Sequence, residues 1–111
     1  MKWKNAQTNT WQNWKKSMRK IVYKERFEFE LAFITEFIAS RDGYQRAEKF
    51  YNDIYAQIDK IPFMPFRFRQ NTEANDKNIR ELIFKGYKVP FHVSSDKIEI
   101  LGIYKTNLWS N

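Results

Sequence analysis

The fold is decided by residues 79–104, which read IRELIFKGYKVPFHVSSDKIEILGIY. Three runs within this stretch alternate apolar and polar side chains, and such a period of two is typical of half-buried β-strands. The runs cover residues 79–84, 87–94 and 97–104. Lys85-Gly86 separates the first two runs, and a glycine permits the positive φ of a two-residue hairpin turn. Ser95-Asp96 turns the chain before the third run, so we expect three consecutive strands.

Pro90 lies inside the second of these runs. Proline has no N–H to donate to a strand ladder, and it is therefore confined to sheet edges and bulges. We expect the backbone nitrogen of Pro90 to face an edge or a bulge.

Two amphipathic helices are predicted before these strands. Apolar side chains recur at helical spacing within residues 27–40. They are Phe27, Leu31, Ile34 and Ile38, with Phe29, Phe33 and Phe37 widening the stripe. A second stripe ends at Pro62, because proline breaks helices. It consists of Ala47, Phe50, Tyr51, Ile54, Ile58 and Ile61. Both stripes, including their aromatic rings, are expected in the core.

The segment Arg41-Asp42-Gly43 interrupts the helical pattern, and Asp42 is predicted to cap the second helix. Two helices joined by so few residues form an antiparallel hairpin. Ile21-Val22-Tyr23 reads as a strand, and residues 62–78 read as a loop. The predicted order is β-α-α-β-β-β, an α+β fold in which the hairpin covers one face of a small, mostly antiparallel sheet.

The composition excludes several classes of protein. The chain has 111 residues, no cysteine and one histidine, His92. Disulfides, thiolate nucleophiles, cysteine-ligated zinc and multi-histidine metal sites are therefore excluded, and we expect no metal and no cofactor. No run approaches the roughly 18 apolar residues that cross a membrane, so we expect a cytoplasmic protein without a membrane partner.

The net charge of +7 is unevenly distributed. Residues 1–20 carry six basic side chains and no acidic one, which suggests a nucleic-acid or acidic protein partner. We interpret residues 1–17 as a basic, tryptophan-containing extension and residues 18–111 as the domain. Met18 is a possible alternative start.

Two stretches resemble the RelE/ParE superfamily of type II toxin–antitoxin toxins. They are residues 79–89, with an arginine-bearing strand before a Gly-Tyr turn, and residues 96–104, with alternating aliphatic side chains. Phe66-Arg67-Phe68-Arg69 is similar to the family's arginine-containing loop, and the resemblance covers residues 18–108. It implies growth arrest, plasmid stabilisation, and an antitoxin whose acidic, partly disordered tail lies over an apolar and basic groove beside the sheet.

The resemblance implies one of two mechanisms. RelE-like toxins cleave mRNA in the ribosomal A site, whereas ParE-like toxins poison DNA gyrase and cut nothing themselves. Cleavage at the 2′-OH needs a base, an acid, cations for the phosphorane and a stacking surface. The candidate catalytic residues would be Arg80, Lys85, Tyr87, Lys88 and Lys105. In the structural interpretation, Arg80 instead pairs with Glu99, Tyr87 packs in the core and His92 is an ordinary strand histidine.

The long hairpin and the incomplete catalytic set favour the ParE-like reading, in which the chain is not an enzyme and its partners are an antitoxin and DNA gyrase. One alternative is a ribosome-dependent mRNA endonuclease. A second is a non-toxic member that binds its antitoxin and helps to repress the operon. The expected partner-binding residues are Arg67, Arg69, Arg80, Lys85, Lys88, Tyr104 and Lys105.

Overall fold

A computed structural model describes residues 18–105, and the predictions for residues 1–17 lie outside the described part. The strands are β1 (Lys20–Tyr23), β2 (Arg69–Gln70), β3 (Ile79–Phe84), β4 (Tyr87–Val93), β5 (Lys97–Ile100) and β6 (Tyr104–Lys105). The helices are α2 (Glu25–Asp42) and α3 (Tyr44–Ile58), followed by short 3-10 turns at Ile61–Phe63 and Pro65–Arg67. The predicted order of one strand, two helices and a meander is confirmed.

The strands form one mixed sheet in the order β1-β5-β4-β3-β2, with β6 beside β4. Within residues 18–105, β1 and β5 are the one parallel pair, and the remaining pairs are antiparallel. Lys85 and Gly86 both have positive φ, 50° and 84°, as the type I′ turn of a two-residue hairpin requires. The mostly antiparallel sheet is therefore as predicted.

The last predicted strand is split in two, and Pro90 lies beside the break. The Pro90 carbonyl accepts a hydrogen bond from the Leu101 N–H at 2.9 Å, but the proline has no N–H to return. The chain leaves the ladder at this point and contacts α2, where the Ile103 N–H donates to Glu30 Oε1 at 3.0 Å. A Cβ on Gly102 would lie 2.7 Å from the same oxygen, so a larger residue at this position would require the Glu30 side chain to move. Pro90 therefore lies where the ladder between β4 and its neighbours is broken, as its missing N–H predicted.

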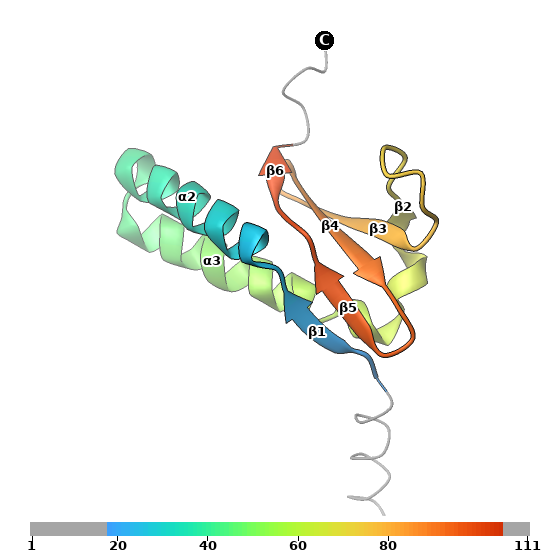
Figure 1. Cartoon of the computed structure of the whole chain (residues 1–111). Coiled ribbons are helices and arrows are strands. Elements are labelled where there is room, and N and C mark those ends of the chain that lie inside the picture. Colours follow the sequence, from blue (N-terminus) through green and yellow to red (C-terminus); the bar gives the residue numbers. More distant parts are fainter. Residues whose placement is uncertain (1–17, 106–111) are drawn as a thin grey trace, which may run out of the picture.

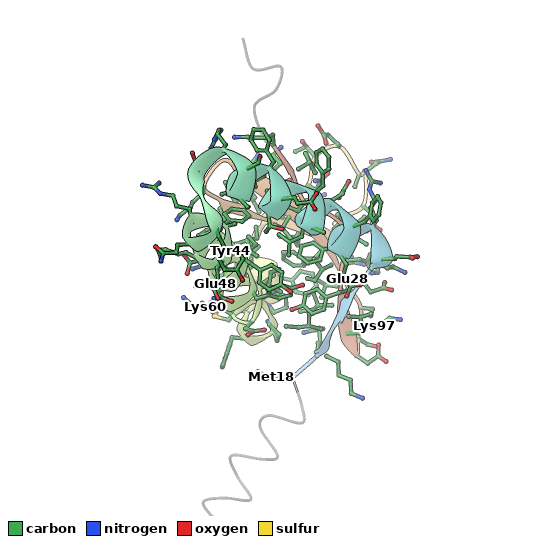
Figure 2. The ribbon with its side chains drawn as sticks, turned by 90° about the vertical axis from the view of Figure 1, so that its left-hand side faces the viewer. Met18, Glu28, Tyr44, Glu48, Lys60 and Lys97 are labelled. Atoms are coloured by element: carbon green, nitrogen blue, oxygen red, sulfur yellow. The ribbon has the colours of Figure 1, made fainter. Side chains whose placement is uncertain are left out.

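The hairpin of α2 and α3 covers one face of the sheet (Figure 1). In Figure 2 the hairpin end points toward the viewer, and side chains fill the space between the two helices and the strands. The innermost side chains are Phe27, Leu31, Ile54, Ile58 and Ile61 from the helical half, and Val89, Phe91, Ile98, Ile100 and Ile103 from the sheet half. Apolar burial between these two layers supplies the main stabilisation of the fold.

The predicted cap of the second helix is wrong. Asp42 is the last residue of α2, where its carboxylate lies 2.8 Å from Arg41 Nη2. Gly43 connects the helices with a φ of 104°, and its N–H donates to the Ala39 carbonyl at 3.0 Å. A glycine in this conformation ends one helix and begins the next without a side-chain cap.

The prediction that every helical aromatic ring is in the core is also wrong. Phe27 is fully buried, but Phe29, Phe33 and Phe37 are 79%, 74% and 50% exposed, and Tyr51 is also exposed. At 100° per residue, Phe29 lies about 200° around the helix from Phe27 and cannot share its face. We call Phe29, Phe33 and Phe37 the phenylalanine ridge.

Candidate functional site

The five candidate catalytic residues do not share one site. The side chains of Tyr87 and Lys105 lie together on the helix-covered face, whereas Lys88 and Tyr104 lie on the opposite face of the sheet. Arg80 is in register with Phe91, four residues along β4 from Tyr87, or about 13 Å. The structure therefore brings together only Lys85, Tyr87 and Lys105 from this set, and it separates them from Arg80 and Lys88.

Arg80 fastens the loop that precedes β3. Its Nη1 donates to the carbonyls of Phe66 and Phe68, at 3.3 and 3.1 Å, and its guanidinium lies 5.0 Å from the centre of the Phe66 ring. The predicted pair with Glu99 is wrong, because the Arg80 guanidinium binds backbone carbonyls and Glu99 has Lys24 Nζ at 3.3 Å and Lys97 Nζ at 3.7 Å instead. This bond to Lys24 holds the pKa of Glu99 below its usual value.

The other two arginines of this loop are both exposed but differ in their contacts. The Arg67 guanidinium lies over the ring of Phe68, 5.4 Å from its centre, and its side chain remains exposed. Arg69 belongs to β2, a two-residue strand that the sequence did not reveal. Arg67 is thus available at the surface, whereas Arg69 is held by an acid.

That acid is Glu81, a buried carboxylate on the open face of the sheet. Its Oε2 lies 2.8 Å from Arg69 Nε and 3.9 Å from Lys88 Nζ, and its Oε1 accepts a hydrogen bond from Asn71 Nδ2 at 2.9 Å. Glu81 and Asn71 are the buried polar residues of the described chain. Sequence reasoning missed both, and Glu81 neutralises the cations that would otherwise meet a phosphate there.

Tyr104 lies beside Lys88 across the ladder between β4 and β6. Partial burial and then the negative charge of Glu73 raise the pKa of Tyr104 above its usual value. This face combines an arginine, a lysine and a tyrosine, but all three surround acidic side chains rather than an empty phosphate-sized site.

A second cluster lies where the hairpin end meets the turn between β3 and β4. Its cavity of about 230 Å³ is lined by Ile38, Arg41, Asp42, Arg46, Phe50, Lys85, Tyr87 and Lys105. The Tyr87 ring is buried against Phe50, with ring centres 5.3 Å apart, so the expected packing role is confirmed. Lys105 Nζ lies 4.9 Å from the centre of the Tyr87 ring, a cation–π contact.

The phenylalanine ridge borders a groove between α2 and β6. The groove has a volume of about 300 Å³ and is lined by Phe29, Glu30, Phe33, Ile34, Ile103 and Tyr104. Strand β6 pairs with β4, and within residues 18–105 no strand pairs with its other edge. Exposed aromatic side chains beside an open strand edge are the usual features of a peptide-binding surface.

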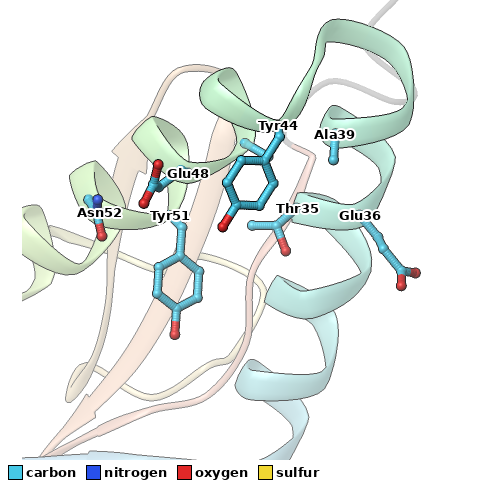
Figure 3. Close-up of a pocket in the computed structure, with 8 residues that line it drawn as sticks. Thr35, Glu36, Ala39, Tyr44, Glu48, Tyr51 and Asn52 are labelled. Carbon is cyan, nitrogen blue, oxygen red and sulfur yellow. The ribbon is translucent and has the colours of Figure 1, made fainter.

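A cavity of about 510 Å³ forms an outer groove between the two helices (Figure 3). The rings of Tyr44 and Tyr51 project into it from α3, and Glu36 and Glu48 lie at its sides. Its remaining lining residues are Thr35, Ala39, Ala47 and Asn52. The side chains that line this groove include two acidic and no basic ones, so the groove is negatively charged, whereas the cluster at the hairpin end is positively charged.

His92 has acidic neighbours on both sides, which the sequence did not reveal. Its Nε2 lies 3.9 Å from Asp76 Oδ2, and its Nδ1 lies 3.8 Å from Glu99 Oε1. Even so, no cluster of three acidic, histidine or cysteine side chains suited to a metal ion occurs in the described part of the chain. Nor is either helix in residues 18–105 long and apolar enough to cross a membrane.

Comparisons with known proteins agree with this architecture. A family model described as "ParE toxin of type II toxin-antitoxin system, parDE" matches residues 21–107. Among solved structures, a chain of the "Chromosomal ParDE TA system from P. aeruginosa" is similar with a TM-score of 0.70 and 19% sequence identity. That match covers 82% of this chain and 99% of the other, and at this identity it shows a common fold. A comparison with curated proteins finds no match.

Proposed function

The chain belongs to the ParE toxin family of type II toxin–antitoxin systems, and from this premise we propose that it arrests growth by binding and poisoning DNA gyrase. In this proposal the toxin cuts no nucleic acid itself and acts in the cytoplasm, where gyrase works. The ParDE system also implies an antitoxin as partner, and we propose that the antitoxin neutralises the toxin by direct binding.

The observation that supports a binding mechanism over RNA cleavage is the separation of the candidate catalytic residues. A base, an acid and a phosphate-binding cation must all reach one phosphate within hydrogen-bond distance. Arg80 is engaged by loop carbonyls, Lys88 faces buried Glu81, and Tyr87 is buried on the opposite side of the sheet. These residues support the fold and do not surround a common substrate.

The phenylalanine ridge supports the antitoxin part of the proposal. Three large apolar side chains along one helix face form a patch that a soluble monomer rarely leaves uncovered. An acidic tail with apolar side chains can cover the ridge and, through its charge, approach a chain of net charge +7 rapidly. Of the expected partner-binding residues, Arg67, Arg69, Lys85 and Lys105 are exposed. Arg69 is already paired with Glu81, and we propose that Arg67, Lys85 and Lys105 contact partners.

The deciding experiment adds the purified full-length chain to DNA gyrase and a relaxed plasmid. We expect loss of supercoiling and accumulation of cleaved plasmid, with recovery when the antitoxin from the adjacent gene is added first. Translating ribosomes incubated with the same preparation serve as the control, and we expect their mRNA to remain intact.

Other outcomes would replace the proposal. Cleavage of mRNA at A-site codons with unaffected gyrase would identify a ribosome-dependent endonuclease. If the chain binds the antitoxin but neither inhibits gyrase nor causes mRNA cleavage, it is a non-toxic member that helps to repress its operon.

A further inference from the structure

The cavity at the hairpin end carries an excess of positive charge. Four cations line it, Arg41, Arg46, Lys85 and Lys105, together with one acid, Asp42. They come from the end of α2, the first turn of α3, the β3–β4 turn and β6. Side chains from four separate elements thus converge on one space of about 230 Å³.

The acids of this region are already bound to cations. Asp42 accepts hydrogen bonds from Arg41 at 2.8 and 3.2 Å, and these bonds hold the pKa of its carboxyl below the usual value. Asp53 binds Lys49 at 2.9 Å and lies 3.9 Å from Lys85 Nζ. Within residues 18–105, neither Arg46 nor Lys105 forms an ion pair, so their charges are available to a ligand.

The floor of the cavity is apolar. Ile38, Phe50 and the ring of Tyr87 form it, and all three are buried. A low-dielectric wall strengthens the attraction between cations and an incoming anion relative to open water. The cavity can therefore bind a carboxylate that also brings an apolar stem.

The cavity is continuous with the phenylalanine ridge. Arg41, which lines the cavity, also lies over the ring of Phe37, 5.0 Å from its centre. From Phe37 the ridge continues along α2 through Phe33 to Phe29, with a rise of about 6 Å between successive rings. One bound segment can thus touch apolar rings first and cations at its end.

We propose that the cavity is an anchor for carboxylate side chains of an acidic protein tail whose apolar residues cover the phenylalanine ridge. This inference rests on the proposed neutralisation by an antitoxin and adds the position and the chemistry of one contact. The antitoxin tail must then carry apolar residues at helical spacing, followed at one end by a group of Asp or Glu.

The test measures binding of the antitoxin from the adjacent gene to the full chain by fluorescence anisotropy, at low and at high salt. The Arg46→Glu/Lys105→Glu double variant reverses two charges of the cavity, and both side chains are exposed. Lys60→Glu/Lys77→Glu is the matched control, because it makes the same charge change on exposed lysines elsewhere. Each double variant lowers the net charge from +7 to +3.

We expect the cavity variant to weaken binding about tenfold or more and to reduce its salt dependence, whereas the control variant changes the affinity less than about threefold. Arg46→Gln/Lys105→Gln should show an intermediate loss, and it preserves the test if charge reversal disturbs folding. Equal losses in the cavity and control variants would overturn the proposal, since only the overall charge would then matter.

A short DNA duplex serves as the second probe. Cavity-dependent binding of the duplex, with antitoxin affinity unchanged by the cavity variant, would overturn the proposal in favour of a nucleic-acid site. None of these measurements contains gyrase. If the chain fails to inhibit gyrase, the proposed target is wrong, but the proposed carboxylate anchor is not contradicted. If the cavity variant binds the antitoxin as well as the control does, the anchor is wrong, but the gyrase proposal is not contradicted.

Discussion

The two helices of the hairpin differ in how they use their apolar residues. On α3, Phe50, Ile54 and Ile58 are buried, and its exposed aromatic residues are the tyrosines Tyr44 and Tyr51. On α2, one row that includes Phe27 is buried, while the phenylalanine ridge faces outward. Both helices thus bury one side, but the exposed rings of α3 are tyrosines with a polar hydroxyl, whereas those of α2 are phenylalanines with no polar group.

The uncovered row of α2 forgoes the stabilisation that burial of its side chains would supply. Burying apolar surface contributes about 25 cal/mol per Å², so an exposed phenylalanine forgoes roughly 2 kcal/mol that a buried one supplies. A folding role cannot explain three such residues in one row. The antitoxin binding proposed above accounts for them, because the same free energy is then released when the partner covers the ridge.

Replacement of Phe27 by alanine is the largest test of this difference. We expect Phe27→Ala to lower the free energy of unfolding by about 3–5 kcal/mol, because it removes a fully buried ring between α2 and the sheet. Phe29→Ala, two residues away on the same helix, should change it by less than about 0.5 kcal/mol. Denaturant unfolding monitored by circular dichroism measures both. Similar losses in the two variants would mean that the ridge also supports the fold.

A substitution on the phenylalanine ridge tests whether the exposed side of α2 binds the antitoxin. We expect Phe33→Ser to reduce the antitoxin affinity by about tenfold to a hundredfold, since an aromatic anchor at an interface contributes about 1–3 kcal/mol. Its unfolding free energy should stay within about 0.5 kcal/mol of the wild type. Thr72→Ala, an exposed change away from the ridge, is the control. Unchanged affinity in Phe33→Ser would show that the antitoxin binds elsewhere.

Alkaline pH tests the region that ties both helices to β1, and it gives the smallest effect. Burial, and then the charge of Asp59, raises the pKa of Tyr23 to about 12, and burial also raises the pKa of Tyr55 on α3. A raised phenol pKa favours the neutral form in the folded state. The contribution to stability is therefore complete below pH 10 and declines as the pH rises toward about 12.

Denaturation curves measured across this pH range should show the decline in the wild type. The Tyr23→Phe/Tyr55→Phe double variant keeps the packed rings, whose centres lie 5.2 Å apart, and lacks both phenols. We expect its stability to fall less over the same range. An equally steep decline in the double variant would assign the alkaline effect to other groups.

The sequence predicted the elements with clear periodicity. The turn at Lys85-Gly86, the second helical stripe and the interruption at Pro90 all follow from local rules, and all three are present. The phenylalanine ridge was assigned wrongly because the pattern showed a wide apolar arc on α2 and not which part of it meets the sheet. Only the packing of α3 and the strands determines that direction.

The candidate site was less predictable because its contacts are distant in sequence. Glu81 contacts Asn71 only when β2 pairs with β3. The residues next to Glu81 in the sequence therefore do not predict that its carboxylate is buried. Arg80 binds backbone carbonyls, which every residue possesses, so no side-chain pattern could name its partner. The cluster at the hairpin end likewise forms only when four elements come together in the fold, so the sequence alone does not predict its positive charge.

The hydrogen bond between Glu30 and the Ile103 N–H connects α2 directly to the residue that precedes β6. Strand β6 is only two residues long and pairs with β4, and this hydrogen bond joins the segment before it to α2. A partner that shifts α2 sideways pulls directly on the end of the described chain. Slowed amide exchange at Ile103 would then report that the neighbouring groove is filled.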